Sequence, residues 1–498
     1  MTSVTKKSII AIAIAAAFSV GVNAQDYPNE STVTQTGNNN EATTVQTGER
    51  NTIISSQVGD DNVTDISQDG YWHEGYSDVT GNGNDVTFTQ TLDWQVASSE
   101  ITGDSNVVDV TQNDYWNTTE MVITGASNDV VLNQDGSRND TNVELIGDNN
   151  TGDIYQLGDS NFTVYRAEGN DNDFIATQEG NSNQAGMIGV NLDRNIGNNN
   201  DLDASQFGDS NLAGVRGVFG NDNNFVMTQD GNNNVGFVYS MTGSSNEVEI
   251  DQTGDSNSAV LEFANGDDND IEIVQDGTSN LIGDPEVAII DGNDNRIDIE
   301  QTGNSNAAEF AVIGDDNFAM LDQEGDSNYA TFGLEGNDND VLMTSDGNSN
   351  QIAVFVTGDD NSAEVTQEGD TNFGYVEISG NDNDVNVEQD GNDNEALASV
   401  IGDNNTDVEL TQNGDLNLID LIILGDENSA MISQTGNGNW VSGEGTASGS
   451  FEITGDSNSL SISQVGNDNI VTGLQSGIGN VIDVTQTGDN NSAIVIQN

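Results

Sequence analysis

Oxygen-bearing side chains recur in short acidic strings along this 498-residue sequence, and each string follows a glycine. Carboxylate and amide oxygens are the ligands that Ca²⁺ prefers in proteins, so calcium is the one cofactor that the residues suggest. The candidate ligands are Asp267, Asp268, Asp270, Asp338, Asp340 and Asp393. The nine-residue Gly-Gly-x-Gly-x-Asp repeat of calcium β-rolls is absent, however, and an acidic turn surface that resists lateral aggregation explains the same strings.

Residues for covalent or acid–base catalysis are scarce. The sequence has no cysteine and one histidine, and its two lysines, Lys6 and Lys7, lie at the extreme N-terminus. Few residues are therefore available to act as nucleophile or base. We predict that the chain has no catalytic residue and is not an enzyme. The single histidine, His73, follows Trp72 and is expected to be solvated.

Three tryptophans are spaced 22 residues apart, at Trp72, Trp94 and Trp116. This spacing predicts one column of aromatic rings along one edge of a repeating structure. Such a column can bind a glycan or a surface, but mutual stacking of the rings explains the same spacing.

Amide side chains recur with a fixed relation to glycine. Glutamine precedes many of the glycines by two residues and asparagine follows them by three, as in Gln301, Gly303 and Asn306. Buried amides stacked in register can donate to one neighbour and accept from the other, which compensates for their desolvation. Near the ends of the chain, glutamine occurs at every eleventh residue. The predicted ladder and polymerisation residues are Gln35, Gln46, Gln57, Gln68, Gln464, Gln475, Gln486, Gln497, Asn306, Asn317 and Asn328.

The elements that hold these amides follow from the period of the sequence. Glycine falls on every eleventh residue from Gly303 to Gly402, and a fixed period is the signature of a solenoid. Residues 269–275 alternate between two faces, as in a half-buried strand, and Gly277 begins a turn. Because glutamine usually occupies alternate turns, the rung has about 22 residues: strand, turn, strand, turn. We therefore predict an all-β, parallel, in-register and cross-β-like β-solenoid of about 20 rungs.

Three insertions support the 22-residue rung. They lie between Gly180 and Gly197, between Gly277 and Gly292, and between Gly436 and Gly455. All three fall in the half-repeat that follows a glutamine turn, so they are expected on one side of the solenoid.

Residues 1–24 read as a secretory signal, because two lysines precede a short apolar run and a small-residue cleavage site. Residues 25–34 are then a short lead-in, and 35–498 form the repeat domain. The chain without this signal has six arginines and 85 acidic residues, a formal charge of −79. Such a charge repels nucleic acids and anionic lipids, and no stretch is apolar over the length needed to span a membrane. We expect a secreted protein without nucleic-acid partners.

The motif Q-x-G-x-x-N-x-A, seen from Gln301 to Ala308 and in part from Gln46 to Asn51, resembles the curlin repeat of bacterial curli fibre subunits. This resemblance covers nearly the whole chain after residue 24. It implies an extracellular functional amyloid, a pilus-type fibre that serves cell adhesion and biofilm formation. It also implies self-association, a minor nucleating subunit and a secretion channel as partners.

Two functions remain open from the sequence. The first is the curli-like fibre subunit, in which the glutamine-rich ends are the surfaces that polymerise, because the end of a solenoid exposes unpaired backbone groups. The second is a monomeric, acidic, secreted β-solenoid that binds calcium or surface glycans.

Overall fold

The computed structural model describes residues 27–187, 195–283, 288–443 and 449–498. These residues fall into two units, one ending at Ser245 and the other running from Asn246 to Asn498. The described residues contain strands and turns but no helix. The predicted all-β fold is therefore confirmed.

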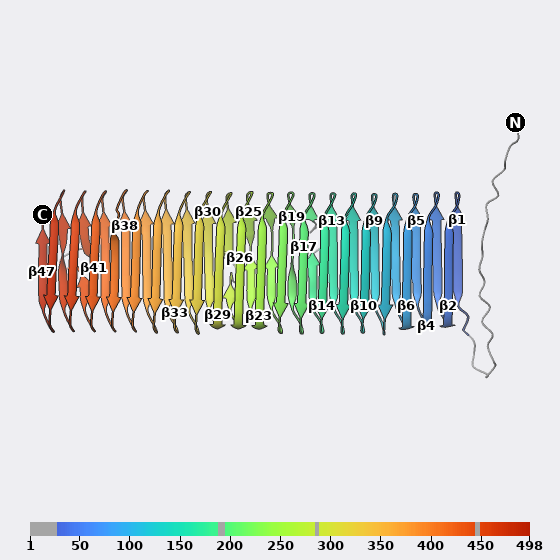
Figure 1. Cartoon of the computed structure of the whole chain (residues 1–498), viewed down its shortest axis with the longest axis horizontal. Helices are drawn as coiled ribbons and strands as arrows, with labels where there is room; N and C mark the ends of the chain where they lie inside the picture. The colour runs from blue at the N-terminus through green and yellow to red at the C-terminus, as the bar shows by residue number, and fades with distance from the viewer. Residues whose placement is uncertain (1–26, 188–194, 284–287, 444–448) are drawn as a thin grey trace, which may run out of the picture. The chain divides into compact units, whose positions relative to one another are not determined.

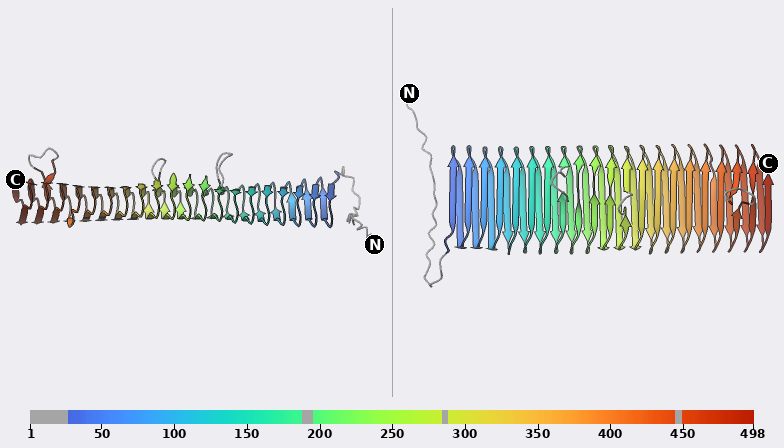
Figure 2. Two further views of the ribbon diagram at one scale, coloured as in Figure 1. Left: turned by 90° about the horizontal axis from the view of Figure 1, so that it is seen from above. Right: turned by 180° about the vertical axis from the view of Figure 1, so that it is seen from behind.

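Each unit is a β-solenoid built from two parallel sheets. A strand pairs with the strand about 22 residues further along the chain, so that Asp129 lies beside Thr151 and Gln134 beside Gln156. The intervening strand belongs to the opposite sheet, and strands of the two sheets run in opposite directions (Figure 1). Seen from above, these sheets appear as two thin layers in each unit (Figure 2, left). The strand–turn–strand–turn rung of roughly 22 residues is confirmed, and the described residues contain about 21 turns of it.

We call one sheet of each unit the glutamine sheet, because all but one of its strands carry an inward glutamine near their ends. In the first unit its strands are β2 (Glu41–Glu49), β4 (Val63–Tyr71), β6 (Asp85–Asp93), β8 (Val107–Asn113), β10 (Asp129–Asp135), β12 (Thr151–Leu157), β14 (Asp173–Glu179), β17 (Asp201–Phe207) and β20 (Asn224–Asp230). In the second unit they are β23 (Glu247–Asp255), β26 (Asp270–Thr278), β29 (Arg296–Asn304), β31 (Phe318–Glu324), β33 (Asp340–Asp346), β35 (Ser362–Glu368), β37 (Asp384–Asp390), β39 (Val408–Asn413), β41 (Ser429–Thr435), β44 (Ser459–Val465) and β46 (Val481–Thr487).

We call the other sheet the aliphatic sheet, because an apolar residue takes the place of that glutamine in most of its rows. In the first unit its strands are β1 (Glu30–Thr36), β3 (Thr52–Val58), β5 (Glu74–Thr80), β7 (Val96–Thr102), β9 (Thr118–Thr124), β11 (Asp140–Ile146), β13 (Phe162–Glu168), β15 (Gln184–Met187), β16 (Asn195–Ile196), β18 (Leu212–Val215), β19 (Val218–Phe219), β21 (Val235–Val238) and β22 (Met241–Thr242). In the second unit they are β24 (Ser258–Leu261), β25 (Phe263–Asn265), β27 (Leu281–Ile282), β28 (Ala288–Asp291), β30 (Ala307–Ile313), β32 (Tyr329–Glu335), β34 (Gln351–Thr357), β36 (Phe373–Ser379), β38 (Glu395–Ile401), β40 (Leu418–Leu424), β42 (Trp440–Ser442), β43 (Phe451–Thr454), β45 (Ile470–Ser476) and β47 (Ser492–Gln497).

The core of each unit lies between its two sheets. Alternate residues of β26 are fully buried, among them Ile271, Ile273 and Gln275, while the residues between them face outward. Buried aromatic rings of adjacent rungs also stack, as do Phe310 and Phe332 with 5.3 Å between ring centroids. Parallel in-register pairing places like residues above one another, so each inward position becomes a column through the core.

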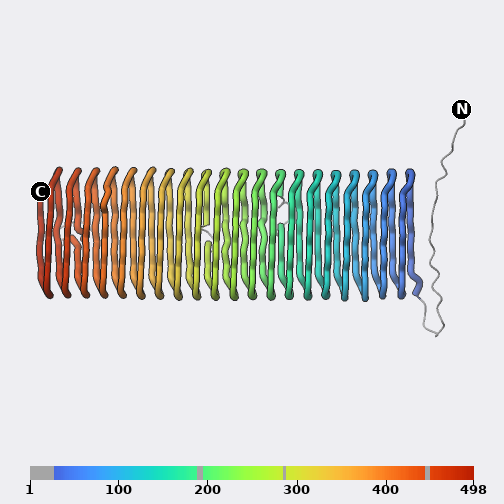
Figure 3. The backbone as a smooth tube through the Cα atoms, in the orientation of Figure 1, coloured from blue at the N-terminus to red at the C-terminus, as the bar shows by residue number. Residues whose placement is uncertain are grey.

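The turns continue the pairing of the strands. Gly325 N donates to Thr302 O at 2.9 Å, and Ser327 N donates to Asn304 O at 2.8 Å. The turn backbone therefore bonds to the turn of the adjacent rung, and the turns form two stacked edges in each unit (Figure 3).

The three insertions fall where the sequence predicted them, in one sheet. They separate β15 from β16, β27 from β28 and β42 from β43, all in the aliphatic sheets. Residues 188–194, 284–287 and 444–448 of these insertions lie outside the described residues, as does the predicted signal segment 1–24. At the N-terminus, β1 begins at Glu30, within the segment expected to be a lead-in.

Candidate functional site: amide ladders and the ends of the sheets

Turn geometry explains the glycine at every eleventh residue. Gly325 has φ +112°, and a Cβ placed there would lie 2.1 Å from the carbonyl oxygen of Gly347 in the next turn. Glycine is therefore required for two reasons, the left-handed conformation and the close approach of backbone. Leu92 and Asp114, which replace glycine in two turns, keep positive φ values of +78° and +72°.

The inward glutamines form a continuous hydrogen-bonded column in the first unit. From Gln46 to Gln229, each Nε2 donates to Oε1 of the glutamine in the next rung, at 2.8 to 2.9 Å. The predicted donation from one rung to the next is therefore present. Because every amide is polarised in the same direction, the column has a donor end and an acceptor end.

The column of the second unit contains one break. Ser345 in β33 stands where its neighbours have Gln323 and Gln367. Its Oγ and the Oε1 of Gln367 are both buried and have no hydrogen-bond partner among the described residues. The ladder resumes from Gln367 and continues to Gln486, with Nε2–Oε1 distances of 2.8 to 3.0 Å.

The asparagines that follow the turns form a second kind of ladder, at both edges. Asn317 N donates to Oδ1 of Asn295 at 3.0 Å, and Asn317 Nδ2 donates to Gly336 O at 2.8 Å. Asn306 and Asn328 are connected in the same way, with Asn328 N donating to Asn306 Oδ1 at 2.9 Å. All three predicted asparagines are buried.

The glutamines at the ends of the chain are distributed over both sheets. Gln46, Gln68, Gln464 and Gln486 belong to the glutamine sheets. The aliphatic sheets contain glutamine at the corresponding inward position only in their outermost described rows, at Gln35, Gln57, Gln475 and Gln497. Elsewhere in the aliphatic sheets the position is mainly apolar, as with Val79 and Ile453.

Serine and threonine hydroxyls inside the core were not anticipated from the sequence. Thr119 Oγ1 accepts from Gln112 Nε2 at 3.1 Å and donates to Gln134 Oε1 at 3.2 Å, so it connects the two sheets. Ser55, Ser77 and Ser99, by contrast, carry buried hydroxyls that bond to none of the described residues. One sequence signal could have revealed these hydroxyls: a serine or threonine lies two residues from an inward apolar residue of the same strand, and so faces the core as well.

The three tryptophans form the predicted column. Their rings stack with centroids 4.8 Å apart between Trp72 and Trp94 and 4.7 Å apart between Trp94 and Trp116. The guanidinium of Arg50 lies over the other face of Trp72, 4.3 Å from the ring centroid. Ring faces within the column are thus covered by neighbouring side chains, so mutual stacking accounts for the spacing.

The expectation that His73 is solvated is wrong. Its side chain is fully buried, because it occupies the inward position that asparagine holds in Asn51 one rung before. Within the described part of the chain, neither ring nitrogen makes a hydrogen bond of normal geometry. Burial lowers the pKa of His73, opposed by the carbonyls of Asp69 and Leu92 and by the carboxylates of Asp93 and Asp69.

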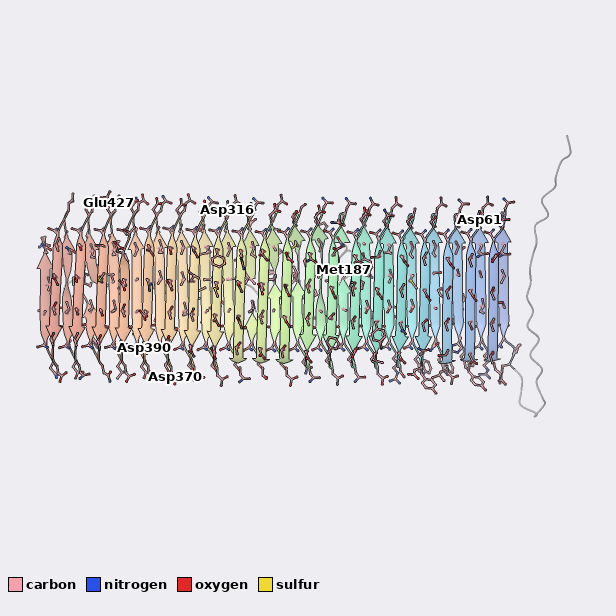
Figure 4. All side chains as sticks on the ribbon, in the orientation of Figure 1. Asp61, Met187, Asp316, Asp370, Asp390 and Glu427 are labelled. Carbon is pink, nitrogen blue, oxygen red and sulfur yellow. The ribbon has the colours of Figure 1, made fainter. Side chains whose placement is uncertain are left out.

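The calcium candidates lie at separate turns. Asp267 and Asp268 are in the turn before β26, whose first residue is Asp270. Asp338 and Asp340 lie three turns further along the same edge. Asp393 belongs to the opposite edge. Figure 4 shows side chains of both edges of the second unit, with Asp316 and Glu427 at one and Asp370 at the other. No group of three or more histidine or acidic side chains among the described residues could hold a metal ion, so calcium stays a prediction.

Stacking also brings carboxylates of adjacent rungs together. Burial raises the pKa of Asp140, and the carboxylate of Glu120 raises it further. Burial likewise raises the pKa of Asp129, with added effects of Asp109 and Asp153. The folded state therefore binds protons on these groups more readily than the unfolded state does. Their contribution to stability is present in acid and is lost as the pH rises through the raised pKa.

Comparison with known proteins agrees with this geometry. A family model described as the curlin associated repeat matches residues 59–91, 147–180, 197–231, 220–254, 243–277, 292–320, 314–347, 358–391, 380–406, 407–436 and 455–488. No curated protein matches the chain. The matched segments cover more than half of the sequence, and they include the glutamine, glycine and asparagine positions of the ladders. The chain belongs to the curlin-repeat family.

Proposed function

We propose that this protein is the structural subunit of an extracellular, curli-like amyloid fibre that mediates cell adhesion and biofilm formation. The observation that carries the proposal is the in-register glutamine ladders of the two units. Among the described residues, Oε1 of Gln46 accepts no hydrogen bond, and Gln486 donates to Ile470 O but to no further glutamine. Cross-β fibres grow by adding such in-register layers. The family is structural rather than catalytic, which agrees with the scarcity of catalytic residue types.

The exposed edges of the terminal strands support self-association as the mode of assembly. Residues of β1, β2 and β47 that would be buried in an inner rung are partly exposed, among them Val33 and Gln46. An unpaired strand edge is a template for another chain. A nucleating subunit and a secretion channel belong to this proposal as further partners, and the chain is proposed to act outside the cell. No helix in the described part of the chain is long and apolar enough to cross a membrane.

Purified residues 25–498 provide the test. We expect fibres by electron microscopy, amyloid-dye fluorescence, and fibre diffraction at about 4.7 and 10 Å. If the purified protein remains a soluble monomer even after prolonged incubation, which allows slow fibre growth, the proposal is contradicted.

A pair of deletions tests whether the ends carry assembly. Removing residues 25–70 and 459–498 deletes the outer rungs with their glutamine-bearing aliphatic rows, and fibre growth should slow strongly. The matched control removes residues 325–346, one whole inner rung, which preserves both ends and the register. Equal growth of the two deletion variants would argue against the ends as assembly surfaces.

A further inference from the structure

The first and the last described strands both belong to an aliphatic sheet. The first, β1, pairs with β3 in the aliphatic sheet of its unit, and the last, β47, pairs with β45 in the aliphatic sheet of its unit. Among the described residues, β2 therefore has no partner strand on its outer edge at one end, and β46 has none beyond it at the other. We infer that successive copies join end to end with a half-turn about the stacking axis, so that the aliphatic sheet of one copy meets the glutamine sheet of the next. This inference rests on the proposed self-assembly.

Backbone pairing distinguishes this junction from its alternative. If like sheets were aligned, β1 of the second copy would lie on β47, and β2 of the second copy would be separated from β46 by an empty strand position. The gap would be about 9.6 Å, twice the normal strand spacing of about 4.8 Å. It would leave two rows of backbone groups unpaired. With the half-turn, β1 of the second copy lies on β46 and its β2 lies on β47, and both edges are filled.

The side-chain amides at the two ends are complementary in this arrangement. No hydrogen bond among the described residues reaches Oε1 of Gln35 or Gln46, or uses an amide hydrogen of Gln497. Of the residues that the structure describes, Gln486 donates only to the backbone oxygen of Ile470. Across the junction, Gln486 would donate to Gln35 of the second copy, and Gln497 would donate to Gln46 of the second copy. Both ladders then pass from one copy to the next.

The outward side chains favour the same pairing. Ile496 on β47 is 57% exposed and Val45 on β2 is 42% exposed. The half-turn places these two apolar residues side by side, whereas aligned like sheets would place Ile496 beside Thr34. Removing apolar area from water stabilises the first arrangement.

The half-turn also gives a reason for the glutamines in the terminal aliphatic rows. In the joined form, Gln464 and Gln486 of one copy continue into Gln35 and Gln57 of the next. A glutamine column therefore crosses the junction and extends two rows into the aliphatic sheet before Val79 ends it. Apolar residues in β1 would instead leave the second amide hydrogen of the buried Gln486, which is not used by Ile470 O, without an acceptor.

Engineered disulfides test the junction, because the chain has no cysteine of its own. The half-turn places Thr34 beside Thr485 of the neighbouring copy, and aligned like sheets place Thr34 beside Ile496. All three side chains are exposed, and adjacent strands are within the Cα separation that a disulfide spans. Fibres of T34C/T485C and of T34C/I496C (residues 25–498) are oxidised, dissolved in denaturant and separated without reductant. Thr32 and Asp483 provide a second half-turn pair.

We expect covalent multimers from T34C/T485C and T32C/D483C, and monomers from T34C/I496C. Covalent multimers from T34C/I496C would overturn the half-turn, and so would fibres that yield no multimers from any of the three variants. Both results leave the proposed fibre function intact. The absence of fibres from the parent protein and the variants would overturn the proposed function and the junction together.

Discussion

The glutamine ladder offers a test in which the same substitution has two different expected costs. Gln389 accepts from Gln367 Nε2 at 2.8 Å and donates to Gln412 Oε1 at 2.8 Å. Gln367 lies one rung before it, next to the break at Ser345, and its own Oε1 has no partner. Replacing each glutamine by leucine removes the same atoms from equally buried sites, but breaks two ladder bonds in the first case and one in the second.

The magnitudes follow from the groups that lose partners. Gln389→Leu leaves a buried N–H of Gln367 and the buried Oε1 of Gln412 unpaired, at about 1–3 kcal/mol each. Gln367→Leu leaves Oε1 of Gln389 unpaired but removes an oxygen that is already unpaired. The gain from burying leucine is the same in both variants. We therefore expect Gln389→Leu to lose about 2–6 kcal/mol more stability than Gln367→Leu.

Hydrogen exchange measured by mass spectrometry provides a local readout, because each rung contacts only its neighbours. A loss of about 3 kcal/mol corresponds to roughly a hundredfold faster exchange, which should be concentrated in β35, β37 and β39. Urea unfolding of the monomer provides the global measurement. Equal exchange and equal unfolding midpoints for the two variants would refute the claim that side-chain amide bonds stabilise the stack.

Three further predictions concern single positions. Ser345→Gln should restore the ladder by donating to Gln367 Oε1, and it should raise stability by about 1 kcal/mol after the entropy of ordering the side chain; a loss of stability in urea unfolding would show that the core there cannot accept the added volume. Gly325→Ala should cost at least about 2 kcal/mol, since it places a Cβ against backbone at positive φ; Gly333→Ala, within a strand, should cost less, and equal unfolding midpoints would contradict the turn argument. His73→Asn should reduce the loss of stability on acidification from pH 7 to pH 5. A histidine whose pKa is lowered in the folded state contributes stability at pH values above its usual pKa, and this contribution is lost as the pH falls through the lowered pKa. Parallel curves of unfolding midpoint against pH for parent and variant would contradict this account.

The sequence by itself determined the rung. The glycine period, the alternation of side chains and the one-sided insertions predict strands, turns and two parallel sheets, because each depends on local backbone geometry that repeats. The in-register amide columns followed from the same period, since parallel pairing at 22 residues places like residues together. The tryptophan column was predicted for the same reason.

Other features were decided only by the tertiary structure. His73 follows a turn, where sequence alone suggests solvent, yet stacking places it at the asparagine position of the core. The threonines that connect the sheets depend on which side chains meet across the core, and a one-dimensional pattern does not contain that distance. The sheets that contain the first and last described strands, β1 and β47, are likewise set by how the rungs close in space. That closure determines which edges are left unpaired, and it is the physical basis for expecting a half-turn between copies.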